Sequence, residues 1–189
     1  QVNDESFDGR NLLYLIENGI ASLNLHTNLD CCPGGVNDVL ASQLGLSGVE
    51  ILNPVGTDEK GRPYGLVRMG EVAEQTLAAF AAFVKRVLSC PGVRFSDAGK
   101  PVRKVAVGGG SCGSEIGDVI AAGCDTFVTA DLKYNHFEEA KYRGLNLIDA
   151  GHFETENPVC DVLEGILREA FPEIPVFRAR AHRDETQFL

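Results

Sequence analysis

Residues 104–149 read KVAVGGGSCGSEIGDVIAAGCDTFVTADLKYNHFEEAKYRGLNLID and decide the fold class of this 189-residue chain. Short apolar runs typical of buried strands alternate there with longer segments of helical periodicity, and glycines punctuate the connections. Strands that alternate with helices indicate an α/β layered fold. The expected strands cover residues 104–107, 126–129 and 145–149, and the expected helices cover residues 114–122 and 135–143.

The flanking sequence adds a hairpin and further helices. Residues 49–52 and 64–69 predict a β-hairpin, which would make the sheets mixed. Residues 74–88 predict the clearest helix, because Leu77, Phe80 and Val84 recur at helical spacing. The other expected elements are a helix at 9–18 closed by Gly19, strands at 20–26 and 176–178, a helix at 36–44, and a last helix with Asn157 as N-cap and Pro158 as first residue.

Composition excludes several classes of protein. The hydrophobic fraction of 44% and charged fraction of 23% are those of a globular chain, and residues 1–189 contain no linker, so we expect a single domain. A net charge of −10 without a basic patch makes nucleic-acid binding an unfavourable interpretation. No apolar run is long enough for a membrane helix, and we expect no signal peptide. The six cysteines lack metal-type spacing, which favours free thiols and the cytoplasm.

Polar residues gather after three expected strands, in residues 26–30, 130–131 and 149–156. Ligands of α/β sheets usually bind outside the carboxyl ends of the strands. Taken alone, an Asp at position 30 is more often a turn-former, and His26 is more often a hydrogen-bonded histidine than a ligand. His152 and Glu156 would share one face of a helix, yet Pro158 favours a strand-to-helix turn there, with Glu154 as a competing carboxylate.

The glycine-rich stretch GGGSCGS, residues 108–114, lies between an expected strand and an expected helix. Free backbone N–H groups at a helix start could cradle a phosphate. Tight packing between the strand and the helix explains the glycines equally well, and the stretch lacks the lysine of a Walker loop. Cys112 could have a lowered pKa near a helix start, but the sequence identifies no partner histidine for a nucleophilic role.

Taken together, these motifs resemble those of the NIF-three-like family, also labelled GTP cyclohydrolase I type 2 homologues. The resemblance spans nearly the whole chain, and the first and last motifs are the most specific. It rests on HTNLD (26–30), PGGVND (33–38), VAVGGGSCGS (105–114), TADLKY (129–134) and NLIDAGHFETE (146–156).

The resemblance implies an α/β fold, a NIF-three-like layered fold with mixed sheets and two lobes around a metal cleft. It further implies a toroidal homohexamer whose subunits each hold two divalent metal ions, with zinc, manganese or iron suiting oxygen and nitrogen ligands. Asp30 would be the carboxylate shared between the ions, His152 and Glu156 would complete the site, and His26 and Asn28 would line it. Cys31 and Cys32 are not expected to be ligands.

Two departures from the family qualify this expectation. Family members carry a His-His-Pro motif upstream of HTNLD that supplies two more ligands, and this sequence contains no His-His pair. We therefore expect a domain that is N-terminally incomplete relative to the family, with partial metal occupancy. The family also often has a histidine directly after DLKY, where this chain has Asn135 followed by His136.

Two functions remain open at the level of sequence. The first is a metal-dependent hydrolase that acts on a nucleotide or phosphoester, with a nucleotide-like small molecule as its ligand. The second is a non-catalytic metal-binding or protein-interaction regulator related to transcription.

Overall fold

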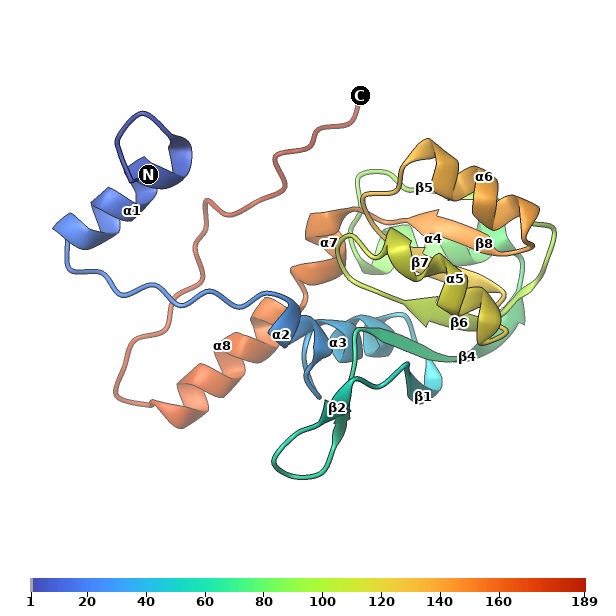
Figure 1. Cartoon of the computed structure of the whole chain (residues 1–189), viewed down its shortest axis with the longest axis horizontal. Coiled ribbons are helices and arrows are strands. Elements are labelled where there is room, and N and C mark those ends of the chain that lie inside the picture. The colour runs from blue at the N-terminus through green and yellow to red at the C-terminus, as the bar shows by residue number, and fades with distance from the viewer. Residues whose placement is uncertain (1) are drawn as a thin grey trace.

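A six-stranded mixed sheet forms the centre of the computed structural model, which describes residues 2–189 (Figure 1). Strands β6, β7 and β8 run parallel to one another, while β4 and β5 pair antiparallel on either side of them and β1 pairs antiparallel with β4. The α/β class and the mixed sheet are therefore confirmed. In spatial order the strands are β1 (Ser47–Leu52), β4 (Val67–Gln75), β6 (Val102–Val107), β7 (Thr126–Thr129), β8 (Asn146–Asp149) and β5 (Arg94–Ser96).

Helices cover both faces of this sheet and create two hydrophobic cores. Helices α3 (Val36–Gln43) and α4 (Leu77–Val87) pack on one face, where Phe80 is fully buried. Helices α5 (Ile116–Ala121) and α6 (Tyr134–Tyr142) pack on the other, around Phe127. Because neighbouring residues of β7 point to opposite faces, Phe127 and Val128 belong to different cores, and every residue of β7 and β8 is buried.

The structure corrects several sequence expectations. Residues 20–26 are extended but pair with none of the strands described within residues 2–189, and Leu23 is 86% exposed. Residues 176–178 form no strand either. The expected strand at 64–69 begins at Val67 instead, after a small hairpin of β2 (Gly56–Thr57) and β3 (Pro63–Tyr64), and β5 was not expected.

Helices also form where loops were expected. The short helix α2 (Thr27–Cys31) begins within HTNLD and ends one residue after it, and HFETE forms α7 (His152–Glu156) shortly after β8. A short 3₁₀ turn (Gly113–Glu115) precedes α5. The last helix, α8 (Val159–Ala170), has Pro158 rather than Asn157 at its N-cap.

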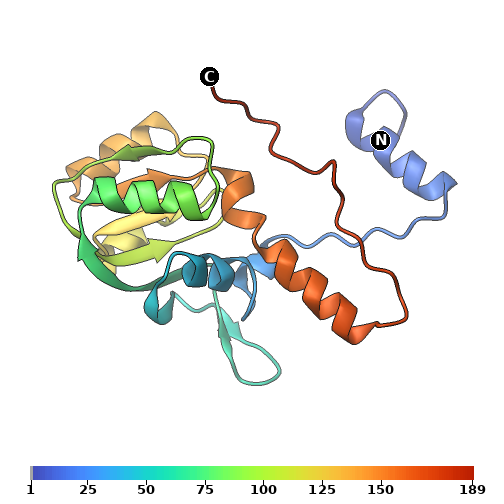
Figure 2. The ribbon, with the colours of Figure 1, turned by 180° about the vertical axis from the view of Figure 1, so that it is seen from behind.

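The N-terminal end of the chain lies away from the sheet, whereas the C-terminal end returns to it: the His182 ring packs 5.1 Å from the Phe153 ring of α7, and Phe188 lies against Gly92. Helix α1 (Phe7–Glu17) connects to α2 through the extended residues, and the segment after α8 runs back past the body of the molecule (Figures 1 and 2). Large apolar side chains are exposed on both, including Phe7 and Ile16 on α1 and Ile174 and Phe177 after α8. None of the helices found in residues 2–189 has the length and apolar character needed to cross a bilayer.

Candidate metal centre

Helix α7 sets His152 and Glu156 on one face at the carboxyl edge of the parallel strands. Gly151 adopts a φ of 87°, a left-handed conformation that lets the chain turn from β8 straight into this helix. Asn157 stays helical although a proline follows it, so the expected strand-to-helix turn at 152–156 is wrong. His152 Nε2 lies 3.1 Å from Glu156 Oε1, the contact that an i, i+4 helical spacing permits.

Asp30 reaches the same region from helix α2. The buried side chain of Asn37 donates to the Asp30 carbonyl at 3.1 Å, and its oxygen accepts from the Gly109 N–H at 2.7 Å. Arg68, also buried, donates to the Cys31 carbonyl and forms an ion pair with Asp38. These contacts fix α2 against the sheet, so the PGGVND motif acts by positioning Asp30.

The structure brings four of the five predicted site residues to one cavity of about 780 Å³: His26, Asp30, His152 and Glu156. Burial raises the pKa of Asp30, and the charge of Glu156 raises it further, against the lowering effect of His26 and His152. The charges of Asp30 and Glu156 therefore oppose each other across the cavity, which is the electrostatic setting a cation would relieve.

Not every prediction about the site agrees with the structure. Asn28 lies outside this cavity: its Oδ1 accepts the His26 N–H at 2.8 Å, and it lines a neighbouring pocket with Cys31 and Cys32. Glu154 is buried and lines a different pocket, with Asp131 and Asp149, so Glu156 is the carboxylate that faces Asp30.

Only two of the three predicted metal ligands are in direct contact in this structure. Within residues 2–189, no group of three or more His, Cys, Asp or Glu side chains already stands together closely enough to hold an ion. His152 and Glu156 are in contact, whereas Asp30 shares the cavity with them.

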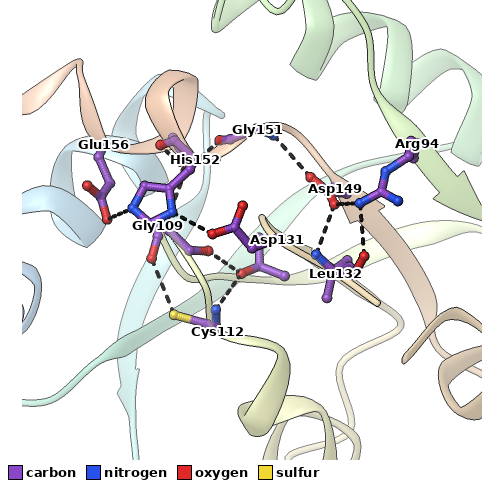
Figure 3. Close-up of polar contacts among 12 residues, drawn as sticks. Arg94, Gly109, Cys112, Asp131, Leu132, Asp149, Gly151, His152 and Glu156 are labelled. Atoms are coloured by element: carbon purple, nitrogen blue, oxygen red, sulfur yellow. Dashed lines mark hydrogen bonds and ion pairs between the residues drawn. The ribbon is translucent and has the colours of Figure 1, made fainter. Parts of the chain in front are cut away.

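Asp131 is a site neighbour that the sequence did not assign. It follows β7, and its Oδ2 lies 2.7 Å from His152 Nδ1, on the opposite side of the ring from Glu156 (Figure 3). Burial lowers the pKa of His152, but the Asp131 hydrogen bond and the Glu156 charge raise it, with a net upward shift. The only sequence signal was the position of Asp131 at a strand end.

A second polar network, centred on Asp149, holds the loops around this pair (Figure 3). The buried Asp149 carboxylate accepts from the Leu132 N–H at 3.0 Å and the Gly151 N–H at 3.2 Å, and it forms an ion pair with Arg94. Arg94 also donates to the Leu132 carbonyl at 2.9 Å. The carboxylate is fully engaged in this way, so Asp149 shapes the site as a structural residue.

The glycine-rich stretch 108–114 is a packing element. Its N–H groups at Gly108, Gly109, Gly110 and Cys112 all donate within the protein, to Val128, Asn37, Thr155 and Thr129 respectively. Gly110 has a φ of 63°, which favours glycine, and a side chain there would displace the Glu156 carboxylate and crowd His152. These contacts favour tight packing over a phosphate cradle.

Two further residues are structural rather than reactive. Burial raises the pKa of the Cys112 thiol to about 12, the opposite of what a nucleophile requires. His136 Nδ1 accepts from the Lys133 N–H at 3.3 Å at the start of α6, and His136 is not among the residues that line the cavity.

The fold and the cavity together define an α/β protein with an imidazole–carboxylate pair at the carboxyl edge of a mixed sheet. The chain belongs to the Duf34/NIF3 family (NGG1p interacting factor 3), whose family model matches residues 1–185.

Relatives and solved structures agree with this assignment. A GTP cyclohydrolase 1 type 2 homolog of Streptomyces coelicolor is 41% identical over 166 residues, which cover 85% of this chain and 58% of the relative. One from Clostridium perfringens is 28% identical over 191 residues, covering all of this chain and 72% of the relative. A hypothetical protein of Staphylococcus aureus superimposes with a TM-score of 0.89 at 28% identity, covering 100% of this chain and 75% of that structure. The chain thus spans a little more than half to about three quarters of these three proteins.

Proposed function

We propose that the chain binds divalent metal ions through Asp30, His152 and Glu156 and forms part of a metal-dependent hydrolase that acts on a nucleotide or phosphoester. One observation carries the proposal. His152 Nε2 and Glu156 Oε1 face each other at 3.1 Å in the cavity that Asp30 also lines, while Asp131 takes up the other ring nitrogen.

The chemistry of the donor set fits a cation. An ionised Asp131 can only accept a hydrogen bond, so a neutral His152 carries its proton on Nδ1 and turns the lone pair of Nε2 toward Glu156. Two acceptors that face each other repel unless a proton or a cation lies between them. Two ligands of one zinc ion at roughly 2.0–2.2 Å are themselves separated by about 3 Å, close to the spacing of this pair. Asp30 would complete the set by turning its carboxylate toward them.

The cavity also suits a substrate of nucleotide size. Small-molecule sites usually measure about 300–1,000 Å³, a range that includes this cavity. Arg183 lines it and offers a positive charge for a phosphate, and His26 lines the same cavity. When bound, divalent ions at such a site would lower the pKa of a coordinated water and polarise the bond to be cleaved.

A role in protein interaction is the second candidate, and the exposed apolar faces favour it. The family is described as an NGG1p interacting factor, and α1 exposes Phe7, Tyr14 and Ile16 while α8 exposes Ile166 and Leu167.

We propose that copies of this chain bury these apolar faces of α1 and α8 in a homohexamer. The six free cysteines support a reducing compartment, the cytoplasm.

Metal content tests the proposed site. The purified chain, incubated with Zn²⁺ or Mn²⁺ and dialysed, should retain metal by elemental analysis, and Asp30→Ala should abolish retention. Glu154→Gln is the matched control, because this carboxylate lies on the same helix but outside the cavity, and it should retain metal like the wild type. Equal retention by the wild type and Asp30→Ala would contradict the assignment.

Turnover separates the two candidate functions. Metal-loaded protein should release product from nucleoside triphosphates or from p-nitrophenyl phosphate, and Asp30→Ala should remove that activity. Metal retention without turnover of any of these compounds would favour the interaction role.

A further inference from the structure

Asp131 occupies an unusual place at the edge of the sheet. Its backbone has a φ of 53°, a left-handed conformation that residues other than glycine seldom adopt and that Asp and Asn tolerate best. Both neighbours are held: the Ala130 N–H donates to the Gly110 carbonyl at 2.9 Å, and the Leu132 N–H donates to Asp149 at 3.0 Å. The loop therefore fixes Asp131 in a strained conformation, and that conformation aims its carboxylate at α7.

The target of that carboxylate is His152 Nδ1, at 2.7 Å. The His152 side chain is 50% exposed, so packing alone does not hold the ring. Asp149 does not compete for the contact, because Arg94 and two backbone N–H groups engage it. Glu156 lies at the other ring nitrogen. Within residues 2–189, Asp131 is therefore the one side chain found in contact with Nδ1.

We propose that Asp131 is a positioning residue: it keeps the proton of His152 on Nδ1 and orients the ring so that the lone pair of Nε2 faces the cavity. The inference rests on the proposed function for the role of this contact, while the contact itself is present in the structure. Histidines that bind metals commonly donate the other ring N–H to a carboxylate, which fixes the tautomer and strengthens the ligand. A free neutral histidine has no such constraint.

The test uses two variants whose new residues tolerate the positive φ of position 131. Asp131→Gly removes the acceptor and suits the positive φ, and Asp131→Asn keeps an uncharged acceptor in the same conformation. The matched control is Asp97→Asn, an exposed aspartate that lines neither pocket beside His152. Circular dichroism and urea unfolding establish that each variant is folded.

The first measurement needs no metal. Long-range ¹H–¹⁵N correlation spectra at about pH 9, above the ordinary pKa of histidine, should show His152 protonated at Nδ1 in the wild type and in Asp97→Asn. Asp131→Gly should lose this preference, with Asp131→Asn between the two. Retention of the Nδ1–H tautomer in Asp131→Gly overturns the proposal.

The second measurement is the affinity for Zn²⁺ or Mn²⁺ by calorimetry. Asp131→Gly should bind about 10- to 100-fold more weakly than the wild type, and Asp97→Asn should match the wild type. Unchanged affinity in Asp131→Gly overturns the role in ligand positioning. A wild type that binds no metal contradicts the proposed function alone, since the tautomer experiment still decides the role of Asp131.

Discussion

Strand β7 and residues 20–26 both look like strands in the sequence, yet only β7 becomes one. Every residue of β7 is buried between β6 and β8, whereas residues 20–26 stay extended and exposed beside the body of the molecule. An apolar pattern indicates that a segment can join a sheet. Whether it does depends on neighbouring strands that supply hydrogen bonds and on elements that cover one of its faces. The sheet supplies both to β7, and residues 2–189 supply neither to the N-terminal segment.

The largest difference should appear in core truncation. Phe127→Ala removes a fully buried ring from β7 and should lower the unfolding free energy by about 3–5 kcal/mol. Leu23→Ala removes a side chain that is 86% exposed and should change it by less than about 0.5 kcal/mol. Urea unfolding followed by circular dichroism measures both. Similar losses in the two variants would show that residues 20–26 are packed in solution.

Alkaline pH probes the cores beside the sheet. Burial raises the pKa of the Cys90 and Cys112 thiols to about 12, so the unfolded chain releases these protons first as the pH rises. Stability should therefore fall as the pH rises above about 8.5, the ordinary pKa of a thiol. The Cys90→Ala/Cys112→Ala double variant should lose that part of the slope in urea unfolding series. An unchanged slope would mean that the two thiols ionise in the folded state as well.

Two glycines with similar backbones sharpen the comparison near the site. Gly19 and Gly110 have φ values of 61° and 63°, so an alanine at either should cost about 1–2 kcal/mol. Only Gly110→Ala also pushes on Glu156 and His152, while a side chain at Gly19 meets open space. Metal retention should therefore fall in Gly110→Ala and persist in Gly19→Ala. Equal metal retention in both variants would show that the glycine-rich stretch does not shape the metal site.

The smallest effect on stability is expected on α1. Ile16→Asp places a charge on an exposed apolar position and should leave the unfolding free energy within about 0.5 kcal/mol of the wild type. It should nevertheless reduce the assembly mass in light scattering, because the proposed homohexamer buries this face. Asn11→Asp, the same charge change at a polar position of α1, should leave the mass unchanged. A monomeric wild type at micromolar concentration would contradict the proposed assembly.

The sequence predicted the elements whose partners are near in the chain. The stripe of Leu77, Phe80 and Val84 predicted α4, and the buried runs predicted β7 and β8 with errors of a residue or so at their ends. Helix α7 was missed because the conformational restriction on a residue before proline was extended to residues 152–156. In the structure Asn157, the residue before Pro158, itself adopts helical backbone angles. Helix α2 was missed because Thr, Asn and Asp are ordinary turn residues.

The candidate site was predictable in composition but not in its supports. The resemblance and the strand ends pointed to Asp30, His152 and Glu156, which the structure places at one cavity. Contacts between distant residues left no local signal: Asp131 touches His152 across 21 positions, and Asn37 reaches Gly109 across 72. Asn28 was misplaced because α2 turns it toward the opposite side from Asp30.

Anomalous diffraction from crystals grown with Zn²⁺ tests the proposed metal centre most directly. We predict a peak about 2.0–2.2 Å from both His152 Nε2 and Glu156 Oε1, with the Asp30 carboxylate turned toward it and Asp131 still on Nδ1. A peak at Cys31 and Cys32, or none between His152 and Glu156 in crystals that hold zinc elsewhere, would contradict it.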